Sequence, residues 1–139
     1  APSGWTQFPK VACDNSGNFY VLYCQSIGTL YVHKFNSSGT SVWRSAADSA
    51  THPSEWTGYN LALDSSNNIY VAYEQYGPYG AYAYASKLNS SGTKLWGDKS
   101  ANTNSGSNNA YDVTVAVYGS YLYVAHRDAA PGAVAASSI

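Results

Sequence analysis

The stretch FYVLY at residues 19–23 returns as IYVAY at 69–73 and as LYVAH at 122–126. The spacing between copies is about fifty residues, which is typical of repeat architectures. β-Branched and aromatic residues dominate the first two copies, and such residues favour a β-strand. The chain is therefore predicted to be a series of related β-sheet units.

A polar turn and a short apolar stretch precede the first two copies. The turns are DNSGN at 14–18 and DSSNN at 64–68. Asp, Asn, Ser and Gly are favoured in tight turns because they bond to the backbone or adopt positive φ. We therefore expect a hairpin in each unit, with strands at 11–13 and 19–23 in the first.

Two more strands follow each hairpin. The sequence FNSSGT at 35–40 matches LNSSGT at 88–93, and each is followed by an apolar residue and Trp, at 42–43 and 95–96. The first unit thus has a predicted third strand at 30–35, a turn, and a short fourth strand that ends at Trp43. Four antiparallel strands per repeat are typical of a blade of a β-propeller, in an all-β fold.

Alternation along the third strand predicts which faces are packed. Residues two apart lie on one face of a strand. We expect a packed face formed in the first unit by Tyr31, His33 and Phe35, and in the second by Tyr84, Ser86 and Leu88. The opposite face of the second unit is expected to approach a neighbouring sheet closely, because it carries only Ala81, Ala83 and Ala85.

The repeated motif resembles that of a known family. The pattern D-x-S-x-N-x-Y-V, here Asp14 to Val21, is followed by K-[FL]-N-S-S-G-T-x-[VL]-W. It is similar to the bacterial and archaeal β-propeller repeat found in surface and secreted proteins. The resemblance implies a blade rather than an activity. It covers about two and a half repeats, because YGSY at 118–121 replaces the third Asp turn and residues 129–139 lack the N-S-S-G-T segment.

The predicted units are residues 1–51, 52–104 and a partial or degenerate third unit at 105–139, together one domain. Propellers ordinarily need about four to eight blades to close. Two and a half to three blades leave sheet faces and edges unpaired. We therefore expect a ring or array that is completed by other chains or by missing sequence.

The two cysteines test the hairpin prediction. Cys13 ends the first strand and Cys24 follows the second, so the hairpin places them at opposite ends. Five residues at about 3.4 Å each separate them by roughly 17 Å, beyond the ~7 Å limit for a disulfide. We expect buried free thiols, with a bridge between two chains as the alternative.

Composition and motifs exclude several classes of function. Charged residues make up only 11% of the chain and nearly balance, so neither nucleic acid nor membrane insertion is expected. The sequence has no nucleophile elbow, no phosphate-binding loop and no close histidine spacing for zinc. We predict no enzyme activity and no cofactor.

Aromatic residues are the candidate ligand-binding groups. The second unit has a longer loop than the first, with Tyr76, Tyr79 and Tyr82 in or beside it, and Trp5 and Trp56 recur at matching positions. Such side chains stack on sugars or pack against a partner. Packing between blades is the alternative for all five.

Asp and Asn side chains provide the other candidates. Turn hydrogen bonds explain Asp14 and Asp64, although the alternating oxygen ligands after each leave calcium as an alternative. Asn36 and Asn89 each begin an N-x-S triplet, the acceptor for N-glycosylation, in a turn where Asn is also ordinary turn chemistry.

The sequence as a whole favours a non-catalytic protein of the cell surface or the secreted class. The chain begins APSGW, has no Met and is rich in Tyr, which is compatible with a removed secretory signal. We expect self-assembly into an oligomer or filament, or adhesion, with copies of itself as partners. The alternative is a propeller lectin whose partner is carbohydrate.

Overall fold

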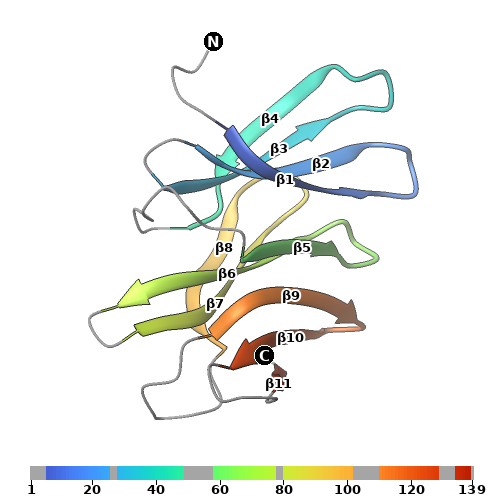
Figure 1. The fold of residues 1–139 in the computed structure, drawn as a ribbon. Coiled ribbons are helices and arrows are strands. Elements are labelled where there is room, and N and C mark those ends of the chain that lie inside the picture. Colours follow the sequence, from blue (N-terminus) through green and yellow to red (C-terminus); the bar gives the residue numbers. More distant parts are fainter. Residues whose placement is uncertain are drawn as a thin grey trace.

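Antiparallel strands form three separate sheets in the computed structural model, which describes residues 6–25, 28–48, 58–77, 80–101, 110–128 and 134–138 (Figure 1). The first sheet contains β1 (Thr6–Cys13), β2 (Phe19–Gln25), β3 (Thr29–Phe35) and β4 (Ser41–Ala46). The second contains β5 (Tyr59–Leu63), β6 (Ile69–Gly77), β7 (Gly80–Leu88) and β8 (Lys94–Ser100). The third contains β9 (Ala110–Tyr118), β10 (Tyr121–Asp128) and β11 (Val134–Ser138).

These sheets confirm the all-β class and the antiparallel pairing expected from the repeats. Within each sheet every strand pairs with its neighbour in the chain, so the order is β1-β2-β3-β4, β5-β6-β7-β8 and β9-β10-β11. The described ranges contain no helix that is long and apolar enough to cross a membrane.

The turns explain why the strands end where they do. Gly17, in the turn between β1 and β2, has a φ of 78°. In the matching turn between β5 and β6, Asn67 takes a positive φ of 60°, which Asn tolerates better than most residues. Both turns place the following apolar strand in register with the preceding one, so that Cys13 pairs with Phe19 and Leu63 with Ile69.

Each sheet has two faces that the repeat makes easy to compare. We call the face that carries Phe19, Ile69 or Leu122 the front face, because these residues occupy the same position in the three units. The back face carries Tyr20, Tyr70 or Tyr123. Successive residues of a strand point to opposite faces, so this division holds along each central strand.

The first core lies between the back face of the first sheet and the front face of the second. Its buried side chains come from both sheets. The first sheet supplies Tyr20, Leu22, Cys24, Leu30 and Val32, and the second supplies Tyr59, Leu61, Ile69, Val71, Tyr73 and Leu88. This arrangement confirms the packed face predicted from Ser86 and Leu88.

The second core lies between the back face of the second sheet and the front face of the third. Small residues line the second sheet here, and Ala72, Ala83 and Ala85 are fully buried. Opposite them lie Val113, Leu122 and Val124 of the third sheet. The expected close approach of a neighbouring sheet to the alanine face is confirmed.

The sheets are stacked with their first strands adjacent. β5 contacts both β1 and β9, and the three strands follow one another down the stack in Figure 1. The first strands carry Ala12, Ala62 and Ala116 at matching positions.

Several sequence-based expectations need correction. The face of Tyr31, His33 and Phe35 is only half-buried, because it is the front face of the first sheet and no described sheet covers it. The third sheet has three described strands, because residues 134–138 pair with β10. Both cysteines are free, and Cys24 is buried as expected, but Cys13 is exposed. A bridge between chains stays a prediction.

The contact between the first two sheets at Gly92 gives a test of their packing. Trp43 Nε1 donates to the Ser90 carbonyl at 3.2 Å, and a Cβ on Gly92 would lie 2.8 Å from the Trp43 ring. At the matching Gly39 a Cβ would meet no described atom within 4 Å.

Both glycines have a positive φ, so Gly39→Ala is expected to lower the free energy of unfolding by about 1 kcal/mol through backbone strain alone. Gly92→Ala is expected to cost about 1–3 kcal/mol more, because it also displaces the Trp43 ring. Urea unfolding measures both variants, and equal losses would contradict the described contact.

Candidate functional site

The front face of the first sheet is an open surface of apolar and aromatic side chains. Val11 is 65% exposed, although Leu61, which occupies the same repeat position in the second sheet, is buried. Phe19 and Phe35 stack across the strands with ring centroids 5.0 Å apart. The equivalents of these two rings, Ile69 and Leu88, are fully buried. The first sheet thus carries the same kind of face as the second, with no described sheet against it.

The back face of the third sheet is open in the same way. Tyr118, Tyr121 and Tyr123 are 80%, 59% and 44% exposed. Tyr20 and Tyr70, which match Tyr123, are buried in the first and second cores. Large exposed apolar and aromatic patches mark interaction surfaces in soluble proteins. The stack therefore ends in two such patches, one at each end.

A hollow lies in the centre of the third sheet's back face. It has a volume of about 160 Å³. Short side chains, Thr114, Ala116 and Ala125, form it together with Tyr123, and Val115 and Val124 also line it. The register pairs Ala116 with Tyr123 and Thr114 with Ala125, so these four residues share the face.

A histidine, His33, lies on the front face of the first sheet. His33 Nε2 lies 2.7 Å from Ser41 Oγ, and the His33 ring lies 4.1 Å from that of Phe35. Partial burial lowers the pKa of His33, and the nearby Arg44 guanidinium lowers it further. Arg44 itself covers the Tyr31 ring at 3.8 Å.

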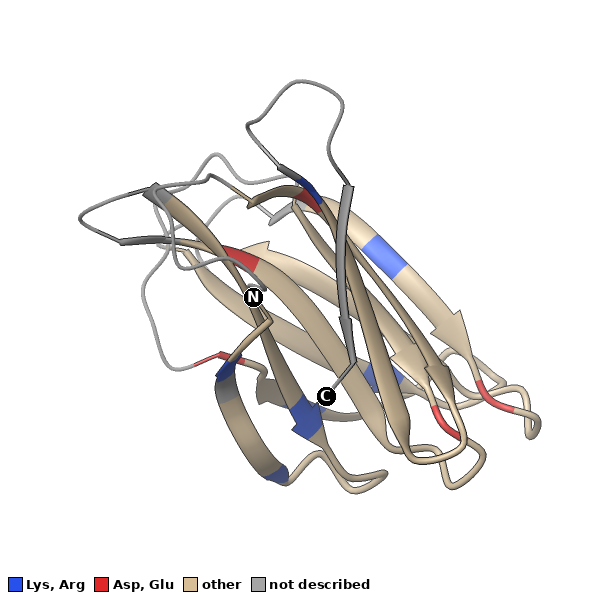
Figure 2. Ribbon diagram, turned by 90° about the horizontal axis from the view of Figure 1, so that it is seen from below, with Lys and Arg blue, Asp and Glu red and all other residues tan. Residues whose placement is uncertain are grey.

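Charge is sparse over the whole molecule. Figure 2 shows few charged positions along the described ribbon. Only 11% of the residues are charged. Any partner that the described surface recognises must therefore be held mainly by shape and apolar contact rather than by a charged patch.

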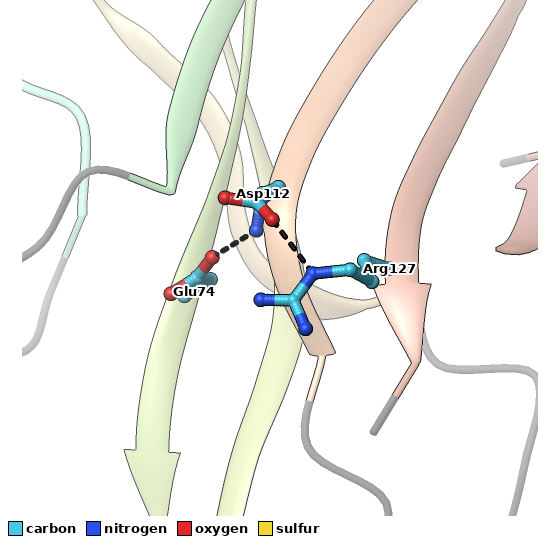
Figure 3. A network of polar contacts seen from close by, with 3 residues as sticks. All are labelled: Glu74, Asp112 and Arg127. Atoms are coloured by element: carbon cyan, nitrogen blue, oxygen red, sulfur yellow. Dashed lines mark hydrogen bonds and ion pairs between the residues drawn. The ribbon is translucent and has the colours of Figure 1, made fainter. Parts of the chain in front are cut away.

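Glu74, Asp112 and Arg127 form a polar network between the second and third sheets (Figure 3). Glu74 is buried, and its Oε1 accepts from the Asp112 amide at 2.5 Å. Arg127 Nε donates to the Asp112 carboxylate at 2.8 Å. Burial raises the pKa of Glu74 to about 6, and the Asp112 carboxylate adds to this shift, while the amides and Arg127 oppose it.

The raised pKa of Glu74 predicts a pH dependence. The folded state binds the Glu74 proton more tightly than the unfolded state does, so stability falls as pH rises from about 4.5 to about 6. Glu74→Gln is expected to make the decrease in the free energy of unfolding between these pH values about 1 kcal/mol smaller. This figure is reduced to allow for screening of the carboxylate by solvent. The glutamine keeps an acceptor for the Asp112 amide. Urea unfolding at pH 4.5 and 7 measures the difference, and an unchanged pH dependence in the variant would contradict it.

His126 is a second buried polar group at the same sheet interface. It belongs to the front face of the third sheet, and neither ring nitrogen has a hydrogen-bond partner among the described residues. Tyr73 occupies the matching position in the second sheet, where its hydroxyl lies 3.1 Å from Ser86 Oγ.

The two Asp turns are fully engaged in hydrogen bonds of their own. Asp14 Oδ1 accepts from the Ser16 and Asn18 amides, both at 2.9 Å. Asp14 Oδ2 accepts from Asn18 Nδ2 at 2.8 Å and from the Tyr20 hydroxyl at 3.2 Å. Asp64 repeats all four bonds with Ser66, Asn68 and Tyr70.

A polar hollow of about 210 Å³ lies between these turns, with Cys13, Asn15, Leu63, Ser65 and Asn67 around it. The described residues include no group of three or more His, Cys, Asp or Glu that would hold a metal ion. The carboxylate oxygens that a calcium ion would need already accept turn hydrogen bonds. The geometry of Asp14 and Asp64 therefore matches the turn interpretation.

Removal of the Asp14 carboxylate is expected to lower the free energy of unfolding. Burial raises the pKa of Asp14, but the hydrogen bonds from Asn18, Ser16 and Tyr20 outweigh it, so the pKa is lowered below 3.8. The stabilisation is complete above that pH and is lost as pH falls further. Asp14→Ala is expected to lower the free energy of unfolding by about 2 kcal/mol at pH 7. Asn15→Ala, an exposed position in the same turn, is the control, and equal effects would refute the role of the carboxylate.

The predicted ligand-binding aromatics are described only in part. Tyr82 lies on β7 and is half-buried. Tyr76 lies on β6, but its side chain is outside the description, as are Tyr79, Trp5 and Trp56 altogether. A ligand-binding role for these five residues therefore stays a prediction.

Asn36 and Asn89 lie in matching turns. The Oδ1 atom of Asn36 accepts from the Ser38 and Thr40 amides, and that of Asn89 accepts from the Ser91 and Thr93 amides. These bonds fit the turn interpretation, and N-glycosylation at either position stays a prediction.

Comparison with known proteins adds no relative. No protein-family model matches the chain, and no curated protein matches it. The function must therefore be argued from the two open faces themselves.

Proposed function

We propose that this chain is a non-catalytic β-propeller segment that acts in self-assembly or adhesion, outside the cell or at its surface. Three features support the propeller arrangement: meander sheets in sequence order, face-to-face stacking, and adjacent first strands. A blade of a propeller has this topology, with its first strand nearest the axis.

The observation that supports assembly is the contrast between equivalent positions. Val71 and Ile69 are fully buried in the first core, whereas Val21 and Phe19 occupy the same positions on an open face. The same contrast separates Tyr70 from Tyr123 at the other end. Open apolar faces of this kind mark surfaces that bind a partner, because covering them removes apolar area from water.

The described polar groups support a structural rather than a catalytic role. Asp14 and Asp64 hold turns, and Glu74 bonds to a backbone amide between two sheets. Catalytic groups usually converge in a concave pocket with a nucleophile or base at hydrogen-bond distance. The hollow at the open face is instead lined by Ala, Val, Thr and Tyr side chains.

Sedimentation of the purified chain over a wide concentration range tests the proposal. We expect reversible association, because each copy presents two apolar faces. Val21→Asp, which charges the front face, should reduce it, while Thr93→Asp, in an exposed turn of the second sheet, should not. A chain that remains monomeric up to millimolar concentration would refute the proposal.

A further inference from the structure

We propose that the partner of each open face is a second copy of this chain, and that two copies close into one ring. The front face of the first sheet of one copy would bind the back face of the third sheet of the other. This inference rests on the proposed assembly function and specifies its partner, its contact and its stoichiometry.

The two internal interfaces provide the template for this contact. In each of them the back face of one sheet meets the front face of the next. The third sheet has a back face with no described successor, and the first sheet has a front face with no described predecessor. A contact between these two faces continues the same back-to-front order without a new kind of interface.

The repeat also fixes the expected register. In the second core, Leu122 and Val124 belong to the same buried cluster as Ala72 and Ala85. Phe19 and Val21 are the equivalents of Leu122 and Val124, and Ala125 is the equivalent of Ala72. Phe19 and Val21 of one copy are therefore expected to meet Ala125 of the other.

The shapes of the two faces agree with that register. The hollow of about 160 Å³ is lined by the small side chains of Ala116 and Ala125, and Ala125 stands where the first sheet carries Leu22. The front face of the first sheet presents the side chains of Phe19 and Val21 from alternate positions of β2. A protruding apolar side chain that fills an apolar hollow gives the close packing found in stable interfaces.

Stoichiometry follows from the number of sheets. Rings of about four to eight blades are able to close. The described residues of one copy form three sheets, which is too few, and three such copies would supply nine. Two chains supply six, so a two-fold ring with two identical contacts is the closed assembly that fits.

Variants with one disabled face test the back-to-front contact. Val21→Asp charges the front face of the first sheet, and Ala125→Asp charges the hollow in the third. We expect the unmodified chain to form a particle of twice its own mass, and each variant alone to be monomeric. An equimolar mixture should form a heterodimer, because one intact front face and one intact back face remain.

The heterodimer should dissociate at a concentration about 100-fold or more above that of the unmodified dimer, since one contact replaces two linked ones. Native mass spectrometry with one mass-labelled variant measures the composition, and circular dichroism checks that each variant is folded. Thr93→Asp, a charge on the middle sheet, should dimerise like the unmodified chain.

The outcomes separate the two proposals. If each variant alone still dimerises, like faces bind each other, and the back-to-front contact is wrong although assembly stands. If the unmodified chain grows into long polymers, the two-copy ring is wrong. If it stays monomeric at every concentration, both proposals fail.

Discussion

Val71→Asp is expected to unfold the chain, whereas Val21→Asp is expected to leave it folded. Both valines occupy the same repeat position, but Val71 is fully buried in the first core. A carboxylate there has no partner and loses its hydration, so we expect a loss of more than about 4 kcal/mol in the free energy of unfolding. At the half-buried Val21 we expect a loss of about 1 kcal/mol or less.

Urea unfolding monitored by tryptophan fluorescence measures this pair at low protein concentration, where association does not contribute. Val21→Ala and Val71→Ala serve as truncation controls that add no charge. Similar losses for the two Asp variants would mean that the front face of the first sheet is covered within a single chain.

Ala72→Leu is expected to have the second largest effect. Ala72 is fully buried against the third sheet, and leucine is the residue that the first sheet carries at this repeat position, Leu22. The larger side chain must displace Leu122 or Val124 or separate the two sheets. We expect a loss of about 3 kcal/mol, at the upper end of the range for overpacked cores.

The matched control is Ala125→Leu, at the same repeat position on the open back face. It is expected to change the stability of the single chain by less than about 0.5 kcal/mol, because the hollow there has room for the extra carbons. Measurement in a Val21→Asp background separates this effect from association. Equal losses at Ala72 and Ala125 would contradict the difference in packing between the two faces.

The sequence allowed the central strands to be predicted well, because each carries its own signal. The Asp turns fix where β2 and β6 begin, and the Asn-Ser-Ser-Gly turns fix where β3 and β7 end. Alternation assigns the faces of these four strands. β1 extends back to Thr6 rather than to Val11. A register shift between Gln7 and Lys10 and a positive φ at Phe8 interrupt its pattern there.

β11 was not predicted as a strand because its residues carry no motif of the repeat. Residues 134–138 pair with β10 through backbone hydrogen bonds, which need no particular side chain. Pairing of this kind follows from the strand beside it rather than from the local sequence. Hydrophobic periodicity alone therefore underestimates the last strand of such a sheet.

The open faces were only half predictable. The repeat predicted that Tyr31, His33 and Phe35 would share a face, and they do. Their exposure was not predictable from the pattern, because Phe35 and Leu88 both precede N-S-S-G-T and only Leu88 has a described sheet against it. Burial at these positions depends on which sheets are neighbours in space, and the repeat motif carries no information about that.

The uninterrupted meander has a consequence for biosynthesis. Every strand pairs only with strands next to it in the chain, so each sheet is complete within a continuous segment of the polypeptide. Chains with such local pairing fold quickly, and during translation the N-terminal elements form first. The first sheet is therefore able to form on the ribosome before the second has been synthesised, and its apolar back face, which carries Leu22, Leu30 and Val32, stays uncovered until the following strands are made.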